Sequence, residues 1–209
     1  MEGLDLSAVE RGVRPILDDR FAARERGLAD SRLVIRSSAK AIRSLHRNEQ
    51  DEADALLAEA GRALEGVYAG LARHPDVLHA GFVADAAKEY AEARITAAVF
   101  RRLPIPGPAE VGIDPVPYLN GLGEVVGEMR RRLLDTLRSG DLVEGERLLT
   151  AMDAIVDLLA DLDYPDGMTS GLRRTTDVAR SLTERSRSDL TATAVQERLR
   201  RDLAGGSGA

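Results

Sequence analysis

The stretch YLNGLGEVVGEMRRRLL, residues 118–134, repeats its apolar side chains with the period of an α-helix. Spacings of three and four put one stripe of apolar residues on this helix: Leu119, Leu122, Val126, Met129, Leu133 and Leu137. Nearly every other segment shows the same period, and none alternates with period two for long enough to be a strand. The pattern predicts an all-α protein.

Six helices are predicted, at about residues 6–46, 49–72, 75–103, 115–138, 142–162 and 169–203. The clearest loop is PIPGPAEVGIDP, residues 104–115, which holds four Pro and two Gly. We expect a bundle of about six to seven long antiparallel helices, forming one domain over residues 1–203. Residues 204–209 are expected to be a flexible tail.

Composition narrows the classes of function. The 29 basic and 35 acidic residues give a net charge of −6, so a surface that binds nucleic acid must gather its positive charge locally. The lack of cysteine excludes disulfides, zinc–thiolate sites and thiol nucleophiles. No apolar run approaches the ~20 residues of a membrane span, and a cytoplasmic protein without membrane contact is expected. Aromatic residues make up 3% of the chain, which disfavours base-stacking platforms.

Two carboxylates interrupt the apolar stripe of the third predicted helix. KEYAEA, residues 88–93, places Glu89 on that stripe, between Phe82 and Phe100, with Glu92 three residues later. A buried, unpaired carboxylate is costly, and two adjacent ones repel. The alternative is an ordinary solvated helix face, where pairs of Glu at this spacing are common.

A second pair lies on the fourth predicted helix, at Glu124 and Glu128. Gly121, Gly123 and Gly127 surround it, and each glycine inside a helix costs about 1 kcal/mol relative to alanine. Close approach of a neighbouring helix or a ligand is the usual reason. If the two helices are neighbours, four carboxylates meet, and such a cluster suits Mg²⁺ or Mn²⁺. Metal-assisted hydrolysis at phosphorus is the chemistry that such a site favours.

The basic stripe is the set Arg36, Lys40, Arg43 and Arg47 on the first predicted helix. Steps of three and four place these side chains on one face, as in helices that track a phosphate backbone. Arg131 follows Glu128 by three residues and is a further candidate for binding nucleic acid. The alternative for all five is a solvated surface with ordinary ion pairs.

Five landmarks, in this order and spacing, resemble those of the translin superfamily over about residues 30–190. They are SRLVIRSSAKAIRSLHR (31–47), KEYAEA (88–93), PVPYLNGLGEVVGEM (115–129), SGD (139–141) and GLRRTTDVARSL (171–182). The branch of translin-associated factor X, with its archaeal members, is the most similar. The resemblance implies an α-bundle that assembles into hollow oligomers, often octamers, and that binds single-stranded RNA and DNA.

In the factor X branch, the resemblance implies an Mg²⁺-dependent endoribonuclease site inside the shell. Its Glu-x-x-Glu pair matches Glu89 and Glu92, and its second acidic pair matches Glu124 and Glu128. The chain departs from the family at two positions. The family usually has Asp in place of Glu124, and it tends to have an acidic residue where this chain has Pro117.

Three functions are therefore considered. The first is a homo-oligomeric, Mg²⁺-dependent endoribonuclease for single-stranded or small structured RNA, with the four glutamates as metal ligands and catalytic residues. The second is a non-catalytic, translin-like protein that binds single-stranded RNA or DNA. The third is an all-α nucleoside-triphosphate pyrophosphohydrolase, which also uses Glu-x-x-Glu on a helix. The wider landmarks fit translin better than this third class.

Overall fold

The structure is a computed structural model that describes residues 5–206. These residues form helices and no strand, so the predicted all-α class is confirmed. The helices are α1 (Ser7–His46), α2 (Gln50–Leu71), α3 (Pro75–Leu78), α4 (Gly81–Phe100), α5 (Pro108–Val111), α6 (Pro115–Ser139), α7 (Leu142–Asp161), α8 (Asp166–Thr169) and α9 (Leu172–Gly206). Four predicted helices match α1, α2, α6 and α7 to within one residue at each end.

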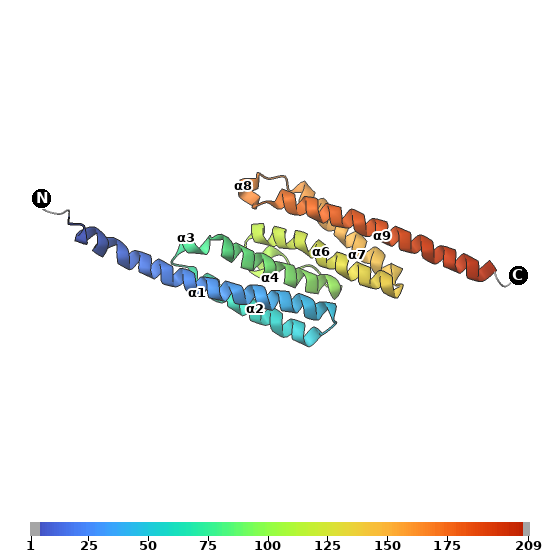
Figure 1. Ribbon diagram of the computed structural model, residues 1–209, viewed down its shortest axis with the longest axis horizontal. Helices are drawn as coiled ribbons and strands as arrows, with labels where there is room; N and C mark the ends of the chain where they lie inside the picture. Colours follow the sequence, from blue (N-terminus) through green and yellow to red (C-terminus); the bar gives the residue numbers. More distant parts are fainter. Residues whose placement is uncertain (1–4, 207–209) are drawn as a thin grey trace. The chain divides into compact units, whose positions relative to one another are not determined.

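Contacts divide the chain into two compact units, with the boundary inside α4 after Ala93. In the first unit, α1 and α2 lie side by side and run antiparallel (Figure 1). Asn48, in the short turn between them, has a left-handed backbone with φ of 60°, a region that Asn enters more readily than most residues. A buried apolar cluster holds this unit together: Ala23, Val67, Leu71, Val77 and Val83.

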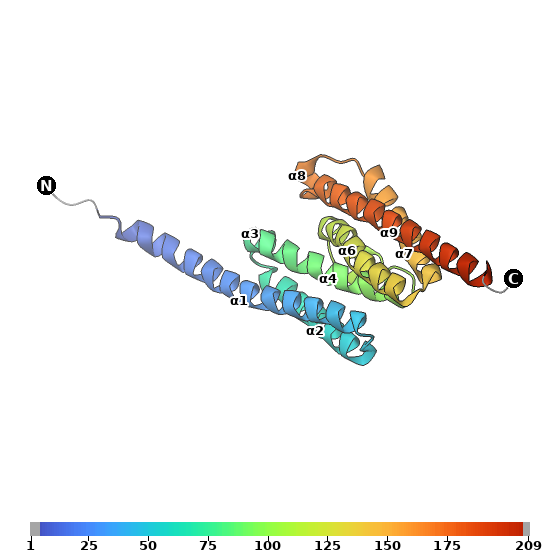
Figure 2. The ribbon, with the colours of Figure 1, turned by 45° about the vertical axis from the view of Figure 1, so that its right-hand side comes forward.

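The beginning of α1 runs past the end of α2 in both ribbon views (Figures 1 and 2). Six apolar side chains of this part are 46% to 64% exposed, and we call them the arm stripe: Leu6, Val9, Val13, Ile16, Leu17 and Phe21. Their spacing of one, three or four residues places them on one side of the helix. The arm stripe is therefore an apolar surface that the described residues leave in contact with solvent.

In the second unit, α6, α7 and α9 lie side by side (Figure 1). Asp114 caps α6 by accepting a hydrogen bond from the Val116 N–H, and Asp141 caps α7 in the same way through the Glu144 N–H. Gly140 ends α6 with φ of 81°, a conformation that costs glycine little. The largest buried side chains of this unit are Ile95, Met129, Leu133, Leu148, Met152 and Leu190.

Two predicted elements are more divided than the sequence pattern indicates, and a third is preceded by a short helical turn. The helix predicted at 75–103 consists of α3 and α4, and the helix predicted at 169–203 corresponds to α9, which follows the short α8. Ser170 and Gly171 separate α8 from α9 because both have positive φ, of 51° and 85°. The loop predicted at 104–115 contains the single turn α5. Backbone breaks of one or two residues leave the apolar period almost unchanged, so periodicity does not reveal them.

No helix in residues 5–206 is long and apolar enough to cross a membrane. Helix α9 continues to Gly206, and residues 207–209 lie outside the described part of the chain. The flexible tail at 204–209 and the single domain over 1–203 therefore stay predictions.

Candidate metal centre and basic surface

Glu89 and Glu92 lie one turn apart on α4. Glu92 is only 9% exposed, and its neighbours Ala91, Ala93 and Ile95 are completely buried. The Glu89 side chain is 28% exposed, and its Oε1 lies 3.6 Å from Nζ of Lys88. The sequence pattern placed Glu89 on the apolar face, and in the structure Glu92 is the more deeply buried of the two.

Glu124 and Glu128 lie one turn apart on α6, and both are half-buried. Four of the six residues in the predicted core stripe of α6 are buried, and the other two are half-buried, at Leu119 and Leu137. The two carboxylates occupy the face beside that stripe. Helix α6 therefore keeps its apolar residues in the core of the second unit and holds two acidic side chains at the edge of that core.

The close approach of a neighbouring helix accounts for Gly123. A Cβ atom at this position would lie 2.4 Å from Cγ2 of Thr175 on α9, and 3.2 Å from Cδ1 of Leu159 on α7. Thr175 is held there because its hydroxyl donates to Oδ1 of Asn120 over 2.9 Å. A Cβ at Gly127 would meet only Leu182, at 3.9 Å, which is ordinary contact. Gly123 thus serves helix packing rather than a ligand.

Glu89, Glu92 and Glu124 form an acidic group that could hold a metal ion. Each offers one carboxylate oxygen, and these oxygens lie within 4.8 Å of one another. Like charges at this range repel, and a divalent cation relieves the repulsion. Opposite ligands of Mg²⁺ lie about 4.2 Å apart, twice its usual bond length, so small side-chain adjustments suffice. Glu128, half-buried one turn after Glu124, is outside this group.

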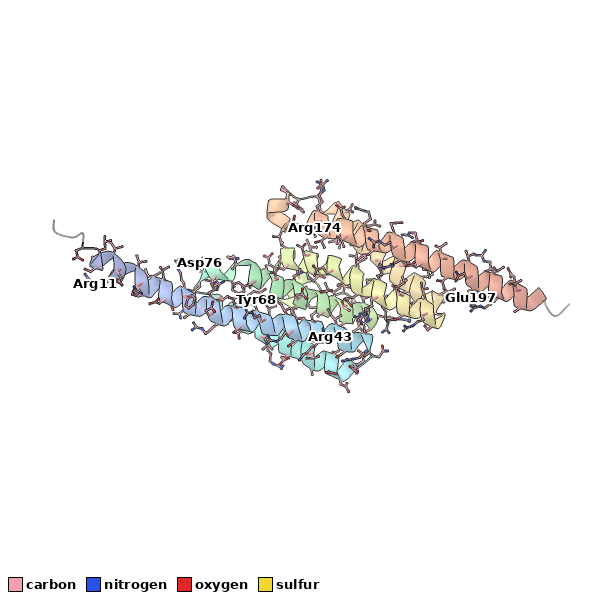
Figure 3. The ribbon with its side chains drawn as sticks, in the orientation of Figure 1. Arg11, Arg43, Tyr68, Asp76, Arg174 and Glu197 are labelled. Atoms are coloured by element: carbon pink, nitrogen blue, oxygen red, sulfur yellow. The ribbon has the colours of Figure 1, made fainter. Side chains whose placement is uncertain are left out.

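The basic stripe on α1 is exposed along its length, and Figure 3 labels Arg43 near the end of the helix. Arg36, Lys40 and Arg43 form no ion pair within residues 5–206. Arg47 donates from Nε to Glu49 over 2.7 Å. Arg32, one turn before the stripe, is also exposed, and the same spacing could have added it to the set. Three of the four predicted side chains are thus available to an anionic ligand.

The three consecutive arginines of α6 have different surroundings. Arg130 donates to Oγ of Ser186 and to Oδ2 of Asp189, at 3.0 and 2.8 Å. The guanidinium of Arg132 lies 5.2 Å from the ring centre of Phe100, a cation–π distance. Arg131 is exposed and has no ion pair within the described residues. Of the three, Arg131 is the one most accessible to solvent and ligands. A residue that binds nucleic acid, as the sequence analysis predicts for Arg131, needs this exposure.

The comparisons with known proteins agree with this architecture. No family model matches the chain. An uncharacterized protein of Methanocaldococcus jannaschii is 28% identical over 189 residues, which are 90% of this chain and 83% of that protein. The crystal structure of AfC3PO is 32% identical with a TM-score of 0.82, and the match covers 89% of this chain and 97% of that one. The chain belongs to the translin superfamily.

Two further structures extend this assignment. AfC3PO was also solved as a complex with duplex RNA, and that chain matches with the same identity of 32% and the same TM-score of 0.82. NeC3PO, in its apo form, is 19% identical with a TM-score of 0.74, which shows the shared fold alone. The resemblance of the five sequence landmarks to the translin superfamily is therefore confirmed.

One cluster of charges in this translin-superfamily chain escaped the sequence analysis. Glu144 on α7 accepts hydrogen bonds from Arg147 at 2.6 Å and from Arg102 at 2.7 Å, and we call these three residues the Glu144 cluster. The hydrogen bond from Arg147 is the main reason why the pKa of Glu144 lies below its ordinary value. Arg147 also donates to the carbonyl of Val99 near the end of α4. The three-residue spacing of Glu144 and Arg147 could have predicted their ion pair from the sequence. The contact of Arg102 could not be predicted in this way, because it lies 42 residues from Glu144.

Proposed function

We propose that the chain is a metal-dependent endoribonuclease that cleaves single-stranded or small structured RNA. The acidic group carries this proposal, because three carboxylate oxygens within 4.8 Å repel each other unless a cation joins them. The relationship to AfC3PO, which was solved with duplex RNA, supports RNA as the polymer that is bound. Oxygen-only ligands favour Mg²⁺, with Mn²⁺ as a substitute.

In this proposal Glu89, Glu92, Glu124 and Glu128 hold the metal. A bound Mg²⁺ would make a water molecule more acidic and offset charge on the phosphoryl oxygens. Glu92, as the most buried of the pair on α4, is a fixed ligand with little freedom to move. Glu128, one turn after Glu124 on α6, would be the one of the four that also positions the attacking water by accepting a hydrogen bond from it. Attack of this water on phosphorus would form a new P–O bond and break the P–O bond to one ribose oxygen, which leaves as an alcohol after taking up a proton.

The RNA backbone is bound by the basic stripe and by Arg131. Their side chains are exposed, and the planar guanidinium forks match phosphate oxygens. Phosphate contacts position a nucleic acid without reading its sequence. Low base specificity is therefore expected, along with an affinity that falls as salt rises.

The arm stripe supports a homo-oligomer as the working form, of the octameric shell type that the family resemblance implies. Six apolar side chains on one exposed helix face are costly in water, and a second copy of the chain removes them from it. Sedimentation of the wild type and of Val13→Glu/Leu17→Glu tests this point. We expect the double variant to sediment as a smaller species. An unchanged sedimentation coefficient would exclude the arm stripe from the interface.

Cleavage of a labelled RNA tests the central proposal. We expect wild type to cut the RNA with Mg²⁺ and not with EDTA, and we expect Glu89→Gln/Glu92→Gln to lose about a hundredfold or more of the rate. Glu59→Gln is the matched control, because Glu59 is a half-buried helix glutamate that accepts a hydrogen bond from Ser37 in the first unit. Equal cleavage by wild type and the double variant would refute the metal site.

Binding of the same RNA tests the basic stripe. We expect Arg36→Ala/Arg43→Ala to reduce the slope of log affinity against log salt by about 1 to 2, since each lost phosphate contact lowers it by about 1. Arg62→Ala/Arg73→Ala is the control, because these arginines are exposed and lie outside the stripe. An equal change in both variants would show that only the total charge matters.

One observation favours the second candidate function, a translin-like protein that binds single-stranded RNA or DNA without cleaving it. The ammonium of Lys88 lies 3.6 Å from Glu89 and already offsets part of the negative charge of the acidic group. In that case the RNA binds with EDTA present, no fragments appear with Mg²⁺, and the basic-stripe variants still weaken binding. Lys88→Met separates the two functions, since cleavage is then expected to rise if Lys88 competes with the metal.

A further inference from the structure

The second unit contains a cavity of about 710 Å³ that the proposed function does not use. It lies where the end of α7, the segment after it, α8 and the first turns of α9 meet, and none of the four candidate glutamates lines it. Its volume falls within the range of about 300–1,000 Å³ that is typical of small-molecule sites. Leu159, Leu162 and Leu172 give it an apolar lining beside its charged residues.

The lining of the cavity combines aromatic, basic and acidic side chains. Tyr164 lines the cavity although its side chain is 59% exposed, so an aromatic surface is available to a ligand. Arg173, on the first turn of α9, also lines it and has no ion pair within residues 5–206. The other arginine of the cavity, Arg180, is paired with Asp177 at 2.9 Å.

Besides Asp177, which is paired with Arg180, two further exposed carboxylates line the cavity, Asp163 and Asp166. A bare phosphate is repelled by them, whatever it gains from Arg173. A ligand that fits all of these groups has a flat aromatic part for Tyr164, hydroxyl or amino donors for the carboxylates, and an anion for Arg173. A nucleoside monophosphate has each part, with its base, its ribose hydroxyls and its phosphate in that order.

We propose that this cavity binds a nucleoside monophosphate, either free or as the terminal nucleotide of an RNA. Tyr164 stacks on the base, Asp163 and Asp166 accept hydrogen bonds from the ribose, and Arg173 pairs with the phosphate. The proposal does not depend on cleavage at the acidic group.

Hydrogen bonds within the chain hold the wall of the cavity in place. Asn120 on α6 donates to the carbonyl of Thr169, which lines the cavity, over 3.0 Å. The hydroxyl of Thr176 donates to the carbonyl of Leu172 over 2.8 Å and is thereby occupied within α9. A preformed wall reduces the entropy lost on binding. The side chains left for the ligand are therefore Tyr164, Arg173 and the two aspartates.

Isothermal titration of the full chain in EDTA tests the proposal with three probes: adenosine 5′-monophosphate, adenosine and inorganic phosphate. We expect the nucleotide to bind with a Kd of about 1 mM or tighter. Adenosine and inorganic phosphate should each bind about tenfold more weakly than the nucleotide, or more weakly still. Tyr164→Ala and Arg173→Ala are each expected to weaken nucleotide binding about tenfold. The absence of nucleotide binding by the wild type, or phosphate binding as tightly as the nucleotide, would overturn the proposal.

The chain offers a close control for each variant. Arg174, which Figure 3 labels, is exposed and adjacent to Arg173 in the sequence but does not line the cavity. Met168, four residues after Tyr164, is likewise exposed and does not line the cavity. Arg174→Ala and Met168→Ala are expected to bind the nucleotide as the wild type does. A loss in Arg174→Ala equal to that in Arg173→Ala would show general attraction by positive charge and would overturn the site.

Two further arms distinguish the sources of the ligand and the two proposals. A trinucleotide RNA with a 5′-phosphate displaces the monophosphate if the cavity receives an RNA end, whereas failure to displace it identifies the free nucleotide as the ligand. Glu89→Gln/Glu92→Gln is expected to bind the monophosphate with unchanged affinity. Loss of cleavage in that variant with retained nucleotide binding separates the two sites.

Discussion

The acidic group and the Glu144 cluster both place carboxylates out of contact with most of the solvent, but they are built differently. Glu144 is 13% exposed and stands alone against two arginines, at 2.6 and 2.7 Å. In the acidic group, three carboxylates converge within 4.8 Å. One carboxylate with two cations is a structural ion pair that needs nothing further, whereas three carboxylates together favour a divalent ligand. Burial of an acidic residue is therefore less informative about function than the sum of the charges around it.

The largest expected effect is the response of the acidic group to Mg²⁺. Binding to the folded chain alone raises the free energy of unfolding by about 2.7 kcal/mol at a hundred times the Kd. We expect this gain in urea unfolding of the wild type with Mg²⁺ against EDTA, and none in Glu89→Gln/Glu92→Gln. Glu144→Gln keeps the gain, because its site holds no surplus of negative charge. A full Mg²⁺ gain in the double variant would place the metal elsewhere.

The next largest effect is expected from Glu144→Gln, which should lower the free energy of unfolding without changing activity. The amide cannot satisfy two guanidinium groups as the carboxylate does, and a charged hydrogen bond contributes about 2 kcal/mol. We expect the free energy of unfolding to fall by about 2 kcal/mol, with RNA cleavage unchanged. Arg102 is mostly exposed, so most of the loss comes from the bond with Arg147. Lost cleavage in a variant that stays folded would contradict the separation of the two sites.

The ion pair of Glu144 and Arg147 also predicts how stability depends on pH. Arg147 holds the pKa of Glu144 below its ordinary value of 4.5, so the unfolded chain takes up the proton at higher pH than the folded chain does. The contribution of Glu144 to stability is therefore complete above pH 4.5 and is lost as pH falls through the lowered pKa. The difference in unfolding free energy between wild type and Glu144→Gln should be constant from neutral pH down to about pH 4.5 and should shrink below that pH. A difference that grows on acidification would have the wrong sign.

The sequence predicted the acidic side chains better than it predicted their burial. Heptad spacing placed Glu89 on the apolar face, where it is half-buried, and it missed that Glu92 is buried more deeply. Around Glu92, helix α4 is buried on nearly all sides, since Tyr90, Ala91, Ala93 and Ile95 are all buried. A pattern method needs a polar face for contrast, and this part of α4 provides almost none.

Pairings between distant elements were beyond sequence reasoning for a different reason. Arg102 meets Glu144 because it follows the end of α4 with φ of 57°, and nothing in the local sequence fixes that direction. The partner of Gly123 is Thr175, 52 positions later and on another helix. A helical stripe shows which side of a helix is buried, but it does not show what lies against it. The resemblance to the translin superfamily implied that the two glutamate pairs share one site, but it implied neither of these two contacts.

The smallest expected effect concerns the glycines beside the two carboxylate sites, Gly123 before Glu124 and Gly145 after Glu144. Alanine at Gly145 meets the ends of two flexible leucine side chains, at 3.0 Å from Leu190 and 3.3 Å from Leu137, so these can move aside. Alanine at Gly123 meets Cγ2 of Thr175, whose rotamer is fixed by its bond to Asn120. After about 1 kcal/mol gained in helix propensity, Gly123→Ala should still lose about 1 kcal/mol, whereas Gly145→Ala should be near neutral.

A second substitution sharpens this prediction. Thr175→Ser removes Cγ2 but keeps a hydroxyl for Asn120, so it creates the space that the alanine Cβ requires. We expect Gly123→Ala/Thr175→Ser to recover the stability lost by Gly123→Ala, measured as a double-mutant cycle in urea unfolding. Metal-dependent cleavage should recover with it, because Glu124 adjoins the displaced residue. Additive effects of the two substitutions would show that Thr175 does not set the position of α6, and Gly123 would then need another explanation.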